Sequence, residues 1–194
     1  MTVQNATQNH EYSVYYLKKY NIWYRKYFPV DVPFKFIARA MCRGKILDVG
    51  CGPGRYLSFL GNRITGVDYN WDFVYYARNK RYRVFHTSEF FGRRMEYFDT
   101  LLFAHILEHM SMEDGIDLIN NYLPYLKFNG RIIIIVPHGY CYKNDPTHVL
   151  YYDRNKIEEL AFKLNFKNGK TFYHPFPDWM SSFLVTDGIY ILSK

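Results

Sequence analysis

The feature that most restricts the fold is a glycine-rich turn that directly follows a short apolar segment. Residues 45–49 read Lys-Ile-Leu-Asp-Val and run into Gly50-Cys51-Gly52-Pro53-Gly54, after which the apolar residues of 56–60 indicate the start of a helix. Glycine adopts backbone conformations that strain other residues, so the chain can turn tightly or approach a ligand there. The pattern predicts a strand, a sharp turn and a helix in succession.

The rest of the chain repeats this alternation of strand and helix. The predicted strands are residues 45–49, 64–67, 82–86, 98–104, 131–136, 166–173 and 189–192, and the predicted helices among them include 71–78, 111–126 and 154–164. Asn70, Ser111 with Asp114, and Asp153 are predicted to cap these helices, and Asn129-Gly130 is predicted to form a turn. Such alternation is typical of a parallel sheet covered by helices on both faces.

The first 44 residues differ from the rest in pattern and in charge. A helix is predicted over residues 11–27, ended by Phe28-Pro29, and a second helix runs from Asp31 to Gly44. Residues 1–47 hold eight basic residues against two acidic ones, so they carry most of the net charge of +7. We expect one domain, with residues 1–44 as a helical extension or lid and residues 45–194 as the core. The charge hints at an anionic partner, although a solvated face of amphipathic helices explains it equally.

Composition excludes several other classes of protein. The longest uninterrupted aliphatic run is Ile132 to Val136, far below the ~20 residues that cross a bilayer. The three cysteines show no CxxC spacing, which argues against a disulfide scaffold and against a cysteine zinc site. No bound metal is expected. The first residues resemble neither a signal peptide nor a transit peptide, so a cytoplasmic location is expected.

The residues around the glycine turn predict a nucleotide-type site. Ligands of such sheets bind beyond the carboxyl ends of the strands, and Asp68 ends the second strand, where its carboxylate can accept hydrogen bonds from ribose hydroxyls. A dinucleotide fingerprint requires a third glycine at position 55, which is Arg55, and Pro53 removes an N–H that would bind a pyrophosphate. Asp48, inside the first strand, suits an ammonium group or a water network. The loop therefore favours a ligand without phosphate.

Several motifs resemble one enzyme family. ILDVGCGPGRYL followed by GVDYN resembles the first two motifs of class I S-adenosylmethionine-dependent methyltransferases. YFDTLLFAHILEHM, LKFNGRIIIIVP and DPTHVLYYDRNKIEELAFKLNF resemble later motifs of its small-molecule branch, with Phe128-Asn129 replacing the usual Pro-Gly. The pattern over residues 45–194 is similar to bacterial O-methyltransferases of the ubiquinone-biosynthesis and lipopolysaccharide-locus types. This resemblance implies a single Rossmann-like domain with a mostly parallel seven-stranded sheet, helices on both faces and the last strand antiparallel.

The resemblance also implies a cofactor, S-adenosylmethionine, with S-adenosylhomocysteine as its product. The glycine loop would surround the methionine portion, Asp68 would bind the ribose and Tyr69 would pack on the adenine. The residues implied at the cofactor are Asp48, Gly50, Cys51, Gly52, Gly54, Asp68, Tyr69, Ala104 and His105, with Ser88 or Glu89 at the adenine amino group.

The acceptor side is predicted from residue chemistry. A hydroxyl acceptor must lose a proton, which a histidine can accept at neutral pH, and His148 and His138 are the predicted bases. Aromatic faces stabilise a sulfonium cation, so tyrosines of the first helix could form a lid over it. The residues assigned to the lid or substrate are Tyr12, Tyr16, Tyr24, Arg25 and His109. The plain alternatives are structural histidines and simple packing of an amphipathic helix.

The predicted activity is methyl transfer to a hydroxyl, or less favourably an amine, of a small or sugar-like and anionic acceptor. An RNA-modifying methyltransferase is the first alternative, because the basic N-terminal segment with interleaved aromatics could hold an RNA backbone. A dehydrogenase and a non-catalytic cofactor-binding protein are the others. His105-Ile106-Leu107-Glu108-His109 matches the H-x-x-E-H signature of zinc proteases. It follows a strand directly and shows no third ligand, so a protease is not expected.

Overall fold

The computed structural model describes residues 10–20, 31–92, 97–143, 145–181, 184 and 186–194. Seven strands form one sheet in the order β3-β2-β1-β4-β5-β7-β6. The strands are β1 (Ile46–Val49), β2 (Ile64–Asp68), β3 (Val84–His86), β4 (Phe98–Ala104), β5 (Leu126–His138), β6 (Lys167–His174) and β7 (Thr186–Ser193).

The direction of the strands confirms the predicted architecture. β1 pairs in parallel with β2 and β4, and the β2–β3 and β4–β5 pairs are also parallel. β7 lies between β5 and β6 and is antiparallel to both. The carboxyl ends of β1, β2, β4 and β5 therefore meet at one edge of the sheet, where ligands of such folds bind.

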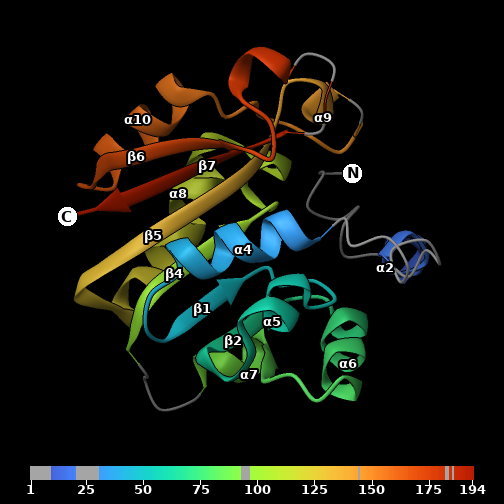
Figure 1. The fold of residues 1–194 in the computed structure, drawn as a ribbon. Helices are drawn as coiled ribbons and strands as arrows, with labels where there is room; N and C mark the ends of the chain where they lie inside the picture. Colours follow the sequence, from blue (N-terminus) through green and yellow to red (C-terminus); the bar gives the residue numbers. More distant parts are fainter. Residues whose placement is uncertain (1–9, 21–30, 93–96, 144, 182–183, 185) are drawn as a thin grey trace.

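Helices cover both faces of this sheet (Figure 1). The longer helices of the core are α4 (Val32–Met41), α5 (Arg55–Leu60), α6 (Trp71–Asn79), α8 (Met112–Tyr122) and α10 (Arg154–Lys163), and the shorter ones are α7 (Thr87–Phe91) and α9 (Tyr140–Lys143). Single 3₁₀ turns lie at η1 (Gly61–Arg63), η2 (Leu107–His109), η3 (Leu123–Tyr125) and η4 (Asp178–Met180). The α4, α5 and α6 side chains share one apolar cluster with the sheet, and those of α7, α8 and α10 share the other.

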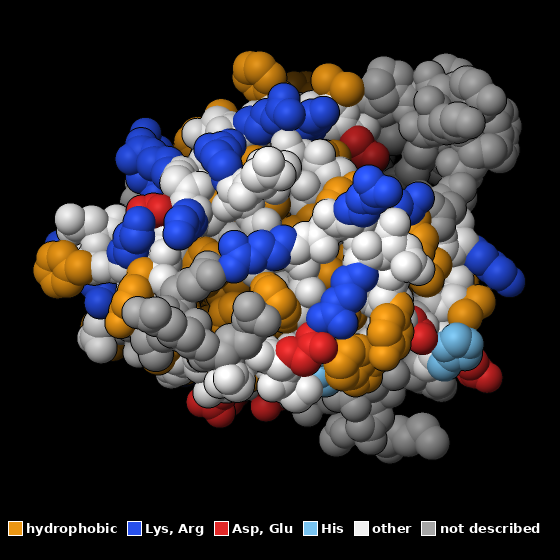
Figure 2. Space-filling model, turned by 90° about the horizontal axis from the view of Figure 1, so that it is seen from below, with side chains coloured by type: hydrophobic (Ala, Val, Ile, Leu, Met, Phe, Trp, Pro, Cys, Tyr) orange, Lys and Arg blue, Asp and Glu red, His pale blue; other side chains and the backbone are white. Residues whose placement is uncertain are grey.

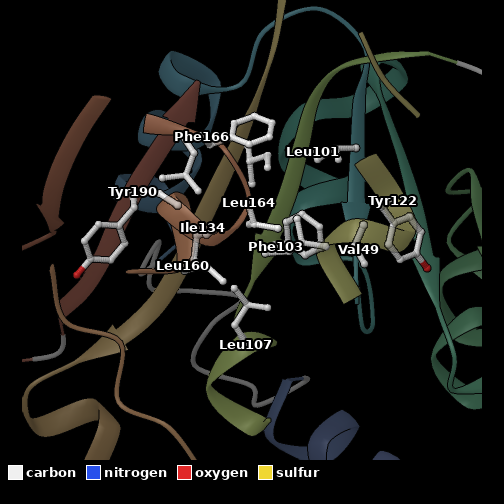
Figure 3. Packing of buried hydrophobic residues seen from close by; sticks show 14 of the residues in the cluster. Val49, Leu101, Phe103, Leu107, Tyr122, Ile134, Leu160, Leu164, Phe166 and Tyr190 are labelled. Atoms are coloured by element: carbon white, nitrogen blue, oxygen red, sulfur yellow. The ribbon is translucent and has the colours of Figure 1, made fainter. Parts of the chain in front are cut away.

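The two clusters follow from the alternation of side chains along each strand. Leu47 and Leu101 belong to the cluster under α8 and α10, whereas Ile46 and Leu102 belong to the one under α4 and α5. Figure 3 shows the first cluster, in which Leu160 of α10 lies near Ile134 of β5. Central strands that are apolar on both faces can be covered only by two layers of helices.

Local signals in the sequence set the helix starts. The side chains of Asn70, Ser111 and Asp153 accept hydrogen bonds from the backbone N–H groups of Asp72, Asp114 and Lys156, respectively. Each satisfies a donor that the first helical turn leaves without a partner. All three predicted caps are confirmed.

The segment before β5 differs from the prediction. Pro124 lies in η3, so α8 ends at Tyr122 rather than at residue 126, and β5 begins already at Leu126. The predicted turn at Asn129-Gly130 lies inside β5. Phe98 pairs with Leu126 and Thr100 with Arg131, so residues 127–130 stand opposite Asp99 in an irregular stretch of the ladder. The chain folds back on itself within this stretch, because a Cβ at Gly130 would lie 2.9 Å from the Lys127 carbonyl oxygen and 2.4 Å from Leu126 Cδ1. The predicted turn is therefore present, as an irregularity inside β5.

The helices before residue 45 pack on the helices that cover one face of the core. In α2 (His10–Tyr20), Ser13 Oγ donates a hydrogen bond to Asp72 Oδ2 of α6 (2.5 Å), and His10 Nδ1 lies 2.7 Å from the same oxygen. Arg39 Nε of α4 donates to the Phe59 carbonyl of α5 (3.0 Å). The predicted helix over 11–27 is confirmed as far as residue 20, and residues 21–27 lie outside the described part.

Among the described residues, no helix combines the length and the apolarity needed to cross a bilayer.

Replacing Ser111 with alanine should lower the free energy of unfolding by about 1 kcal/mol, because the α8 cap is lost. Urea unfolding followed by circular dichroism measures this change. Asn120→Ala, at an exposed position of the same helix, should keep or raise the midpoint, because alanine has the higher helix propensity. Equal midpoints for Ser111→Ala and the unmodified protein would show that the cap contributes nothing.

Candidate functional site

The glycine loop between β1 and α5 has the backbone conformation that requires glycine. Gly50, Gly52 and Gly54 have φ angles of 72°, 51° and 92°. The N–H groups of Gly50 and Cys51 both donate to the Val67 carbonyl, at 2.8 and 3.1 Å. These bonds hold the loop against the end of β2.

The three glycines do not serve the same purpose. A Cβ at Gly50 would lie 2.4 Å from Ile106 Cδ1, so close packing requires glycine there. A Cβ at Gly52 would meet no atom within 4 Å. The backbone at Gly52 therefore faces open space, where a ligand can approach it.

Asp68 joins this loop to the turn after β2. Its Oδ2 accepts a hydrogen bond from Gly52 N (2.7 Å) and its Oδ1 accepts one from Asn70 N (2.8 Å). Burial raises the pKa of Asp68 to about 6, although these two donors act in the opposite direction. A carboxylate has about four acceptor positions, so Asp68 keeps capacity for further hydroxyl donors.

Asp48 is a buried carboxyl group without a partner. Only 1% of the residue is exposed, and neither carboxyl oxygen has a hydrogen bond among the described residues. Burial, and to a smaller extent repulsion by Asp68, raise the pKa of Asp48 to about 8. A buried carboxylate of this kind is stabilised by a cation or by hydrogen-bond donors. Asp48 and the open space at Gly52 therefore fit a ligand that carries an ammonium group.

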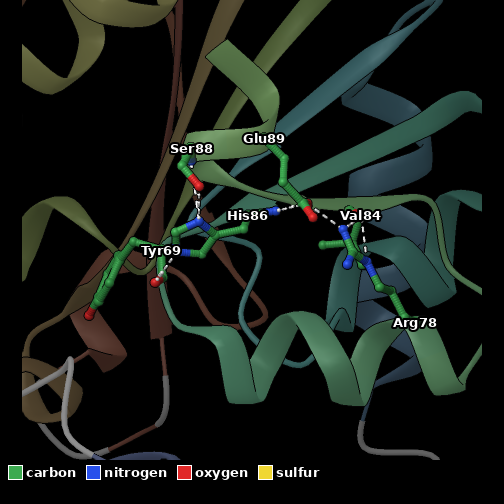
Figure 4. A network of polar contacts seen from close by, with 6 residues as sticks. All are labelled: Tyr69, Arg78, Val84, His86, Ser88 and Glu89. Atoms are coloured by element: carbon green, nitrogen blue, oxygen red, sulfur yellow. Dashed lines mark hydrogen bonds and ion pairs between the residues drawn. The ribbon is translucent and has the colours of Figure 1, made fainter. Parts of the chain in front are cut away.

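Past β3, the structure separates the two residues predicted near the adenine (Figure 4). His86 links Ser88 to Tyr69, because its Nδ1 lies 2.8 Å from Ser88 Oγ and its Nε2 lies 2.8 Å from the Tyr69 carbonyl. Glu89 points away from Tyr69, accepts a hydrogen bond from His86 N and forms an ion pair with Arg78. This arginine lowers the pKa of Glu89. Ser88 is thus the residue on the Tyr69 side.

His105 occupies a strained position directly after β4. Its φ angle is 55°, and its N–H donates to the Ile135 carbonyl (2.8 Å). Its Nε2 lies 3.3 Å from Asp187 Oδ2, and its Nδ1 lies 3.5 Å from Glu108 Oε1. Burial disfavours the protonated ring, but these two carboxylates outweigh it and raise the pKa of His105 to about 10. His105 is therefore a cation at neutral pH, next to the buried Ala104.

The sequence analysis did not single out Asp187 or Glu108. Glu108 occurs in the H-x-x-E-H pattern, so a local signal for it exists. Asp187 lies on β7, more than 80 residues beyond His105, and no local pattern marks it. Only the insertion of β7 beside β5 brings the two together.

The two predicted bases differ in their surroundings. His138 is buried, with its Nδ1 2.8 Å from the Tyr151 hydroxyl and its Nε2 2.7 Å from Asp178 Oδ1. Both of its nitrogens are thus engaged. His148 Nδ1 lies 2.7 Å from the Tyr142 carbonyl, and this is the one hydrogen bond of the ring within the described part of the chain. His148 therefore keeps one nitrogen available.

His109, assigned to the substrate side, lies beside His148. The two ring centroids are 5.1 Å apart. His109 Nδ1 lies 3.2 Å from the Thr147 carbonyl and 3.1 Å from Thr147 Oγ1. The structure thus brings together two histidines that the sequence analysis had given different roles.

The predicted lid residues are described only in part. The Tyr16 ring packs edge-on against Phe73 of α6, with centroids 5.7 Å apart. Tyr24, Arg25 and the side chain of Tyr12 lie outside the described residues.

Comparison with known proteins points to one class. Residues 47–134 match the sequence model of the methyltransferase domain family. Together with the fold, this match supports a class I S-adenosylmethionine-dependent methyltransferase, with S-adenosylmethionine as the cofactor. No curated protein matches the sequence at a significant level.

Solved structures share this fold at low sequence identity. A TehB-like S-adenosylmethionine-dependent methyltransferase from Corynebacterium glutamicum is 21% identical, with 96% of this chain and 100% of that chain covered and a TM-score of 0.67. Magnesium protoporphyrin IX methyltransferase from Synechocystis PCC 6803, with bound S-adenosylmethionine, is 14% identical over 84% of this chain and 76% of its own (TM-score 0.58). Mitomycin 7-O-methyltransferase is 13% identical over 100% of this chain and 61% of its own (TM-score 0.67).

Asp48→Asn should make the protein less sensitive to alkaline pH in the absence of ligand. Because the folded-state pKa of Asp48 is raised, its contribution to stability is fully present below about pH 4 and is lost as the pH rises through about 8. The stability of the variant relative to the unmodified protein should therefore grow between pH 5 and 9, by at least ~1 kcal/mol. Urea midpoints across this range measure it, with the exposed Asp117→Asn as control. A difference that stays constant with pH would contradict the assignment.

Proposed function

We propose that the chain transfers the methyl group of S-adenosylmethionine to an oxygen atom of a small, anionic acceptor. Two observations support the cofactor part of this proposal: the buried carboxyl of Asp48 has no hydrogen bond among the described residues, and the backbone at Gly52 faces open space. S-adenosylmethionine has an ammonium group and a sulfonium but no phosphate. Both charges suit a site lined by acidic groups.

The residue roles follow from this placement. Asp48 holds the methionine ammonium, and the backbone of the Gly50–Gly54 loop, with Cys51, surrounds the methionine portion. Asp68 binds the ribose hydroxyls, which its remaining acceptor positions allow. Tyr69 packs on the adenine and Ser88, rather than Glu89, lies nearest to its amino group. Ala104 and His105 lie at the methionine end, past β4.

The acceptor is placed at His148. Because Asp178 and Tyr151 engage both nitrogens of His138, His148 is the better of the two predicted bases. Its Nε2 is available to a hydroxyl, and O-methylation requires that a hydroxyl lose its proton. The similar fold of an O-methylating protein, mitomycin 7-O-methyltransferase, supports an oxygen acceptor.

Charge supports an anionic acceptor. Residues 1–47 carry six of the seven net positive charges. Helix α4, which belongs to this segment, packs on α5 of the core. Figure 2 shows Lys and Arg side chains spread over the face seen from below. We propose that residues 1–44 cover the acceptor side of the core formed by residues 45–194. A cytoplasmic location is also proposed, supported by three free cysteines.

Calorimetric titration with S-adenosylhomocysteine tests the cofactor site. We expect micromolar binding of S-adenosylhomocysteine and no binding of NADH. Asp68→Ala should bind S-adenosylhomocysteine at least tenfold more weakly, because it loses both the ribose contacts and the hydrogen bond from Gly52 N. Glu89→Gln, which removes a carboxylate on the opposite side of His86, should bind normally. Equal binding by Asp68→Ala and the unmodified protein would refute the assigned role of Asp68.

A second prediction concerns the basic N-terminal segment. Replacing Lys18, Lys19, Arg25 and Lys26 together with glutamine should raise the acceptor KM several-fold, because an anionic acceptor loses its counter-charge, while the affinity for S-adenosylhomocysteine stays unchanged. Initial-rate kinetics on a panel of anionic hydroxyl compounds and on tRNA measure this. Methylation of tRNA alone would favour the RNA-modifying alternative, and an unchanged KM would refute the role of the segment.

A further inference from the structure

Three side chains at the carboxyl edge of the sheet converge on one point. Glu108 and His109 belong to the 3₁₀ turn η2 after β4, and His148 belongs to the loop between α9 and α10. One ligand atom from each of the three lies within 4.8 Å of the other two. The convergence is a tertiary one, because His148 follows His109 by 39 residues.

Contacts with backbone carbonyls favour the same tautomer for both histidines. His148 Nδ1 faces the Tyr142 carbonyl at 2.7 Å, and His109 Nδ1 faces the Thr147 carbonyl at 3.2 Å. A carbonyl oxygen can only accept, so each neutral ring carries its proton on Nδ1 and presents a lone pair on Nε2. Metal-binding histidines are oriented in this way, with the second ring nitrogen donating to a carbonyl or a carboxylate.

His109 has a second supporting contact of the same kind. Thr147 Oγ1 donates to Asp145 Oδ1 (2.6 Å), so its lone pairs face His109 Nδ1 at 3.1 Å. The chain from Asp145 through Thr147 to His109 raises the electron density on the ring. A histidine held in this way is a better ligand for a cation.

Glu108 places a buried carboxylate in this cluster, and only one of its two oxygens faces His105. Only 1% of the residue is exposed, and Oε2 has no hydrogen-bond partner among the described residues. Oε1 lies 3.5 Å from His105 Nδ1, which leaves Oε2 unsatisfied. A buried, unpaired carboxylate oxygen is costly unless a cation or a donor binds it.

The backbone holds these elements in fixed positions. Val149 N and Leu150 N donate to the Glu108 carbonyl at 2.7 and 3.2 Å, and His148 N donates to the Asp145 carbonyl at 3.2 Å. The loop that carries His148 is thus bonded directly to the turn that carries Glu108 and His109. The three side chains are preorganised by contacts that do not involve a ligand.

We propose that Glu108, His109 and His148 bind one divalent transition-metal ion. Two imidazoles and one carboxylate suit Zn²⁺, Fe²⁺, Co²⁺ or Mn²⁺, whereas Mg²⁺ and Ca²⁺ favour ligand sets made of oxygen. Structural zinc sites have four protein ligands, and three leave a coordination position open. The sequence analysis expected no metal, and it found no third ligand for the H-x-x-E-H segment that follows β4. In the structure Glu108 and His109 of this segment lie in a 3₁₀ turn, and His148 is the third ligand.

The open coordination position allows the ion to bind the acceptor hydroxyl, a role that rests on the proposed function. An acceptor hydroxyl bound to the ion loses its proton to solvent more readily. The oxygen then forms a bond with the methyl carbon, while the carbon–sulfur bond breaks and its electron pair goes to sulfur. The products are the methyl ether, S-adenosylhomocysteine and one proton. His148 then acts as a ligand rather than as the base itself.

Metal binding can be tested directly on untagged protein stripped with a chelator. Titration with Co²⁺, followed by its visible d–d absorption, and with Zn²⁺ by calorimetry should each show one equivalent bound. His109→Ala, His148→Ala and the near-isosteric Glu108→Gln should each weaken binding by about 100-fold, a loss at least as large as that from removing outer-shell partners. His10→Ala, an exposed histidine outside the cluster, is the matched control and should bind normally. Azide should change the cobalt spectrum if a coordination position is open.

Thermal melting and titration with S-adenosylhomocysteine on the same samples distinguish an unfolded variant, a failure of the metal site and a failure of the cofactor site. Variants that keep the melting temperature of the stripped protein are folded, so their loss of metal reports the ligands. Substoichiometric binding, or equal binding by His109→Ala, His148→Ala and the unmodified protein, would overturn the metal site while leaving the cofactor site standing. Metal binding without binding of S-adenosylhomocysteine would refute the proposed function instead.

Discussion

The carboxylate of Asp68 ties together the two loops on which the cofactor site depends. By accepting hydrogen bonds from Gly52 and from Asn70, it fixes the glycine loop after β1 against the turn that starts α6. Asn70 in turn caps α6, whose Asp72 anchors α2. One buried acidic group therefore sets the position of the glycine backbone, the start of a helix and the docking of the N-terminal segment. Asp68 is 5% exposed, and this burial raises its pKa.

Buried acidic side chains lie at the carboxyl edge of the sheet, although the protein as a whole is basic. Asp48, Asp68, Glu108 and Asp187 are all buried there, while the net charge of the protein is +7. His105 is the cation that the structure itself supplies, between Asp187 and Glu108. Within the described part of the chain, neither oxygen of Asp48 and only one oxygen of Glu108 has a partner. The ammonium of the cofactor and a divalent ion would complement these two charges.

Much of the fold could be predicted because its signals are local. The caps at Asn70, Ser111 and Asp153 and the apolar strands involve residues close together in sequence, and the glycine loop fixes the position of the nucleotide site. What failed depends on pairing or on distant residues. The predicted end of α8 at residue 126 is wrong, because Leu126 already pairs with Phe98 of β4. Asp187 reaches His105 only through β7, and His148 reaches His109 only through the loop bonded to the Glu108 carbonyl. The periodicity of apolar residues, two residues in a strand and 3.6 in a helix, reveals which face of an element is buried but not which distant residues meet.

The position of β7 constrains the order in which the molecule can be assembled. Within the described part of the sheet, β6 pairs with β7, and β7 is the strand that joins it to β5. β6 leaves the ribosome first but has no place in the sheet until β7 inserts beside β5. The Asp187 side chain arrives with the same strand. During synthesis His105 therefore lacks the carboxylate of Asp187 until β7 joins the sheet, so the sheet and this part of the site are completed together.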